Sequence, residues 1–110
     1  MRKVIEDAAT ALLRALCVNF VNFGGTFRVD ELRSRSWASV TFSGARHQLA
    51  FSLEGAGAGA AADAFLATME EAEFDLGGHL LADIVLVGEN RNLAGDKVQV
   101  RLEALTVEDG

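Results

Sequence analysis

The hydrophobic period of this chain changes from helical to extended twice, and a double glycine marks each change. "FGGTFRVD" (residues 23–30) and "LGGHLLAD" (residues 76–83) share an apolar residue, two glycines, a short strand-like run and an aspartate. Glycine suits the point where a helix passes into a strand with no room for a side chain. The repeated phrase predicts two helix–hairpin units, a possible pseudo-repeat of residues 1–54 and 56–108 inside one domain that spans residues 1–110.

Two segments carry the apolar spacing of an amphipathic helix. In residues 2–18, apolar side chains such as Ile5, Leu12 and Leu16 recur at steps of three and four, and residues 59–72 repeat the pattern. Alanine and leucine, which have the highest helix propensities, are frequent in the first segment. We therefore expect one helix at the start of each unit.

The segments after the double glycines alternate with a period of two, as strands do. Residues 37–42 and 47–54 alternate on either side of "SGAR" (residues 43–46), which predicts a hairpin with its turn at that glycine. The pattern leaves open whether residues 26–42 form one long bent strand or two. Residues 97–107 alternate as well and predict the closing strand.

Together these elements predict an α+β fold with two layers. The expected sheet is mostly antiparallel, has four to five strands and carries both helices on one face, in the order α-β-β(-β)-α-β-β. By analogy, this is a ferredoxin-like arrangement whose first strand has moved to the end of the chain.

The segment at residues 80–87 is apolar on both alternating sides, which is typical of a strand covered on both faces. Helices on one face of the sheet would leave its other side open to water. A second copy of the chain is a common cover, so we expect a homodimer through the sheet face. Residues 1–55 carry seven Lys/Arg and five Asp/Glu, whereas residues 56–110 carry three and eleven, so opposite charges would favour the pairing.

Charge and composition exclude several classes of protein. The formal net charge of −6 argues against a general nucleic-acid binder, which needs a basic face. Charged residues interrupt the apolar run of residues 1–17, so we expect no secretory or membrane segment there. The single cysteine cannot form a disulfide within the chain, and a reducing, cytoplasmic location is expected.

Two histidines are the candidates for a catalytic site. His47 and His79 each begin a strand, and a right-handed crossover between those strands would make them parallel and bring both imidazoles to one edge of the sheet. Imidazole titrates near neutral pH, and Asp83 could orient it. However, His79 and Asp83 would lie about 13 Å apart along a strand. We expect partly buried, hydrogen-bonded histidines, and an enzyme that uses His47 or His79 is the alternative.

A second candidate site is basic and aromatic. Arg33, Arg35 and Trp37 share one side of an extended segment, and Arg46 lies across the hairpin turn. Guanidinium groups beside an indole can bind a phosphate or stack on a base. We expect a solvated edge on which an arginine rests on the tryptophan, and anion or nucleic-acid binding is the alternative.

Two further features of the sequence are expected to be structural. Gly55, Gly57 and Ala60, with Asp75 farther on, fit the dinucleotide-binding fingerprint. A tight antiparallel hairpin precedes them and the chain is short for a doubly wound fold, so we expect a flexible connector and no cofactor. Cys17 lies in an apolar setting and is expected to be a small buried residue, and no metal-ligand spacing occurs.

Taken together, these features favour a small non-enzymatic module that binds a ligand or a protein and works as a homodimer. Membrane association is not expected. The enzyme and the anion or nucleic-acid binder remain the alternatives.

Overall fold

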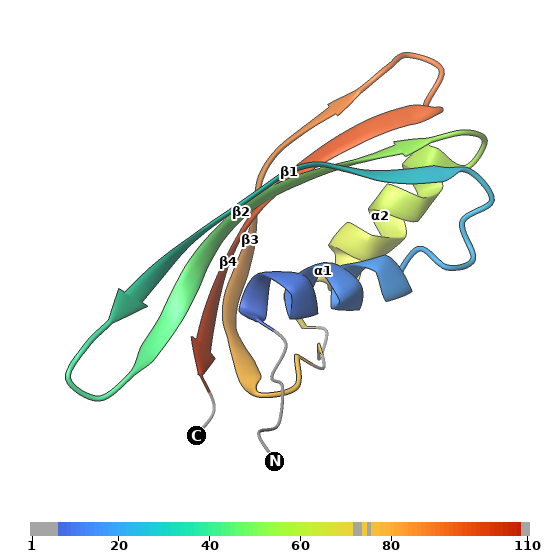
Figure 1. Cartoon of the computed structure of the whole chain (residues 1–110). Helices are drawn as coiled ribbons and strands as arrows, with labels where there is room; N and C mark the ends of the chain where they lie inside the picture. The colour runs from blue at the N-terminus through green and yellow to red at the C-terminus, as the bar shows by residue number, and fades with distance from the viewer. Residues whose placement is uncertain (1–6, 72–73, 75, 109–110) are drawn as a thin grey trace.

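The computed structural model describes residues 7–71, 74 and 76–108, and it confirms the predicted class and order of elements (Figure 1). Within these residues the elements are α1 (Ala8–Val18), β1 (Thr26–Ala38), β2 (Ser43–Glu54), α2 (Ala58–Thr68), β3 (His79–Arg91) and β4 (Lys97–Glu108). The fold is α+β, with both helices on the same side of the sheet. Neither helix, at 11 residues each, is long and apolar enough to cross a membrane in the described part of the chain.

The four strands form one antiparallel sheet in the order β1-β2-β4-β3. β2 and β3 are therefore parallel to each other, with β4 between them and α2 connecting them. This is the relation between the two histidine-bearing strands that the sequence predicted.

Residues 26–38 form a single strand whose register shifts between Val29 and Glu31, which settles the choice between one strand and two. The hairpin turn that follows was misplaced by the sequence pattern. It lies at residues 39–42, where Ser39 and Phe42 exchange hydrogen bonds, and "SGAR" belongs to β2.

The core lies between the helices and one face of the sheet. The central strands β2 and β4 turn alternate residues inward, and α2 lies over both of them. Fully or almost fully buried apolar side chains include Leu12, Leu16, Phe51, Leu53, Phe65, Val98, Val100 and Leu102. Four phenylalanines, at positions 20, 27, 51 and 65, contact one another with ring centroids 5.2 to 5.9 Å apart. This aromatic cluster joins the loop after α1, the two strands of the first hairpin and α2.

The two double glycines serve different purposes. A Cβ on Gly25 would lie 2.2 Å from the carbonyl oxygen of Glu54, so glycine is needed where β1 begins beside the end of β2. In the second copy, Gly77 has a φ of +66°, a conformation that glycine adopts without strain. The pseudo-repeat itself stays a prediction.

Candidate functional site

The face of the sheet opposite the helices, here called the open face, carries side chains in cross-strand rows. Residues that pair across neighbouring strands share a face, so the register defines each row. The first three rows, starting at the β1–β2 turn, are Trp37–Gly44–Val107–Leu80, Arg35–Arg46–Leu105–Asp83 and Arg33–Gln48–Glu103–Val85.

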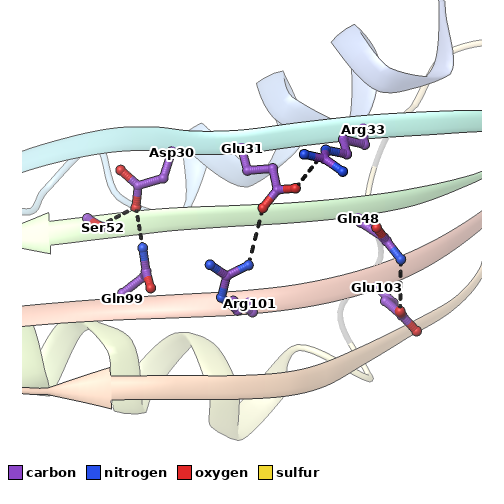
Figure 2. A network of polar contacts seen from close by, with 8 residues as sticks. All are labelled: Asp30, Glu31, Arg33, Gln48, Ser52, Gln99, Arg101 and Glu103. Carbon is purple, nitrogen blue, oxygen red and sulfur yellow. Dashed lines mark hydrogen bonds and ion pairs between the residues drawn. The ribbon is translucent and has the colours of Figure 1, made fainter.

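The far half of the open face is a network of paired polar groups (Figure 2). Glu31 forms an ion pair with Arg33 at 2.9 Å and accepts a hydrogen bond from Arg101 at 3.2 Å, which links β1 to β4 across β2. Gln48 donates to Glu103 at 3.5 Å. Charge in this half is therefore balanced within the chain.

Asp30 is the most connected group of that network. It stands at the register shift of β1 and accepts hydrogen bonds from Ser52, Gln99 and Arg28. Partial burial acts to raise the pKa of Asp30, but these donors and the charge of Arg28 outweigh it and hold the pKa below its ordinary value. The carboxylate is thus ionised and tied to three strands.

The half nearer the β1–β2 turn is different. Arg35 and Arg46 are directly opposite each other on β1 and β2, and neither has an ion pair or hydrogen bond through its side chain to any described residue. Trp37 occupies the next row, and its indole nitrogen is buried without a hydrogen-bond partner among the described residues. We call Arg35, Trp37 and Arg46 the arginine–tryptophan patch.

Gly44 makes room for this indole. A Cβ at residue 44 would lie 3.0 Å from Cζ2 of Trp37 and 2.0 Å from the carbonyl oxygen of Thr106 on β4. This glycine is therefore required by close approach of neighbouring groups and not by a turn, which explains why the sequence pattern misplaced the turn. Arg33, the fourth predicted member of the basic site, lies on the same face but pairs with Glu31.

His47 lies on the helix-facing side of β2 and is 1% exposed. Its Nδ1 is 2.7 Å from the hydroxyl of Ser34 on β1, and its Nε2 is 2.9 Å from the hydroxyl of Thr106 on β4. The Thr106 hydroxyl also donates to the carbonyl of Ala45 at 3.4 Å. Hence Thr106 accepts from the Nε2–H of His47, and Ser34 donates to Nδ1.

This chain of hydrogen bonds favours a neutral imidazole. Burial lowers the pKa of His47, the nearby charge of His79 lowers it further, and Asp7 acts in the opposite direction. A serine that donates to a neutral histidine is the geometry of a nucleophile and its base. In a catalytic triad, a carboxylate beside the other ring nitrogen stabilises the imidazolium. Here the hydroxyl of Thr106 occupies that place.

The structure brings together only part of the predicted histidine site. His79 acts electrostatically on His47, and both lie on the helix-facing side, since His79 pairs with Glu108 in the same alternation that turns Thr106 inward. Asp83 follows a register shift after Leu81 and lies on the open face. It therefore lies on the opposite side of the sheet from the His47 ring, whose two nitrogens contact Ser34 and Thr106.

Sequence reasoning missed Ser34 and Thr106. Thr106 stands at an inward position of β4, in step with the buried Val100 and Leu102, and a hydroxyl at such a position signals a buried partner. Ser34 gave no comparable signal, because its link to His47 depends on the register of the first hairpin.

The remaining candidates contribute no charged side chain within the described residues. The hollow between the end of α1 and α2, about 440 Å³, is lined by small and aromatic side chains such as Ala61 and Phe65, and by the polar side chains of Asn19, Asn22 and Thr68. Gly55 and Gly57 form the short turn before α2, and Asp75 lies outside the described residues. Cys17 is partly buried, which raises the pKa of its thiol. No group of three potential metal ligands occurs among the described residues.

Comparison with known protein families, with curated proteins and with solved structures finds no match for this chain.

Proposed function

We propose that this protein is a non-enzymatic binding module that works as a homodimer, with the two copies meeting along β3 and the strip of the open face beside it. One observation carries the proposal: an edge strand of the sheet exposes large apolar side chains on both of its faces.

The exposed side chains belong to the segment that is apolar on both sides in the sequence. Leu80, Leu86 and Val87 are 54%, 42% and 57% exposed. Leu80 lies in the first row of the open face, whereas Leu86 pairs with the inward Leu102 and so lies on the helix side, where α2 covers β2 and β4. No single face of a partner would cover both, but a strand added alongside β3 would.

A second copy of the chain fits this edge. Residues 79–88 contain one acidic residue, Asp83, and no Lys or Arg, so two β3 strands can approach with little repulsion. Two-fold pairing of identical edges is a common way to cover such a strand. Because the far half of the open face is a closed polar network, we restrict the contact with the face to the strip that includes Leu80 and Val85.

The test is the molar mass in solution, measured by size-exclusion chromatography with light scattering at micromolar concentration. We expect twice the 11.7 kDa of one chain. The variant Leu80→Lys/Val87→Lys should have the mass of one chain, because it places two charges in the contact. Val40→Lys is the matched control, since Val40 is fully exposed at the β1–β2 turn and outside the contact. A monomeric native protein, or a lysine variant that stays dimeric, would contradict the proposal.

The same proposal places the protein in a reducing compartment such as the cytoplasm. Its support is the single cysteine, which is a free, partly buried thiol in the structure.

A further inference from the structure

We propose that the arginine–tryptophan patch binds a single tetrahedral oxyanion, either inorganic phosphate or the phosphate group of a small ester. This site is separate from the dimer contact and goes beyond it, because it names a ligand for the binding module.

The first argument is the unpaired charge. Directly opposite side chains in an antiparallel pair have Cβ atoms about 5 Å apart, and like charges at such positions destabilise the sheet. Elsewhere on the open face, arginines have carboxylate partners, as Arg28 has Asp30 and Arg101 has Glu31. Arg35 and Arg46 face each other without one among the described residues. A bound anion would supply the missing negative charge.

The second argument is the donor geometry. A guanidinium group presents several N–H donors in one plane and commonly binds two oxygens of a phosphate at once. Two such groups on adjacent strands can approach one tetrahedral anion from two sides. Trp37 borders them in the next row, and its buried indole N–H has no acceptor among the described residues.

The rest of the face limits the size of the ligand. Asp83 ends the row of Arg35 and Arg46, and Glu103 in the next row accepts from Gln48. Beyond that row, Glu31 pairs with Arg33 and Arg101 (Figure 2). A strand of nucleic acid would bring further phosphates against these acids, and the net charge of −6 would oppose it. The patch therefore suits one phosphate group and not a polyanion.

The dimer contact is centred on a different strand from this patch. Arg35, Trp37 and Arg46 lie on β1 and β2, while the proposed contact lies on β3, on the other side of β4. Loss of anion binding and loss of dimerisation can therefore be observed separately, by fluorescence and by molar mass.

Trp37 is the only tryptophan of the chain, so its fluorescence reports directly on the patch. We would titrate the protein with inorganic phosphate and with glycerol phosphate at constant ionic strength, and with sodium chloride as the control. We expect a saturable change with phosphate or its ester and none with chloride. Arg35→Gln and Arg46→Gln should each weaken binding about tenfold or more, because each removes a charged donor.

Arg33→Gln is the matched control, since Arg33 is on the same face of β1 but pairs with Glu31. The affinity of this variant for phosphate should stay within about twofold of that of the native protein. Circular dichroism would verify that each variant is folded. Saturation by both probes would identify the oxyanion alone as the ligand, and saturation by the ester alone would identify an ester. No saturable change, equal weakening by Arg33→Gln, or tighter binding of a single-stranded oligonucleotide would overturn the proposal.

Discussion

The two edge strands of the sheet, β1 and β3, each have a sheet neighbour on one side only within the described residues, but their side chains differ. β1 carries five charged residues along its length, whereas the first ten residues of β3 carry only Asp83. Charged edges discourage pairing with another sheet, and long apolar edges favour it. The comparison indicates that one edge is protected from association and the other is free for it.

The largest expected effect comes from giving β1 the character of β3. Arg33→Val/Arg35→Val would create a second apolar edge, and a molecule with two such edges can extend into chains of copies. We expect light scattering to show masses well above that of a dimer, with lower solubility. Gln99→Val/Arg101→Val on the central strand β4 is the matched control, because this strand has neighbours on both sides, and it should leave the mass unchanged. Equal aggregation of both variants would show that edge position does not matter.

The second prediction compares how closely a glycine is packed in each of the two hairpins. Gly44→Ala places a methyl group against the Thr106 carbonyl and the Trp37 ring, and should lower the free energy of unfolding by about 1–3 kcal/mol. Gly88→Ala in β3 has nothing within 4 Å of the new Cβ and should cost far less. Chemical denaturation of both variants measures the difference. Equal losses would mean that the close approach at Gly44 is not a constraint.

The element order and the core could be predicted from the sequence because they follow from the hydrophobic period alone. Inward positions such as Phe51, Val98 and Val100 are in the predicted alternation and are buried. The basic site was also predictable in part, since Arg35 and Trp37 are two residues apart and must share a face of a regular strand.

The features that the sequence pattern did not predict correctly depend on contacts between distant segments of the chain. The sequence pattern predicts Gly44 to be a turn residue, but its role is set by β4, about sixty residues farther along the chain. The register shift after Leu81 moves Asp83 to the open face, and no residue type in that stretch signals it. The partners of His47 come from two other strands, so only the register of the sheet reveals them.

The smallest expected effect concerns the hydrogen bonds that hold β1 to the central strands. The Ser34–His47–Thr106 chain of hydrogen bonds links β1, β2 and β4. Burial keeps the pKa of His47 below its ordinary value of about 6.5. The folded state then binds fewer protons than the unfolded state, so stability falls as the pH falls from about 7 to 5. His79 and Asp7 are the titratable neighbours that act on this group. We expect the stability of His47→Gln to fall less than that of the native protein over this pH range, measured by thermal unfolding at several pH values. An equal fall in both proteins would contradict the role of His47.

Hydrogen exchange, followed by mass spectrometry at two protein concentrations, tests most directly whether β3 is the associating edge. If two copies meet there, the backbone amides of β3 should exchange more slowly than those of β1, and their protection should increase with protein concentration. Similar exchange in both edge strands, unchanged between the two concentrations, would contradict association along β3.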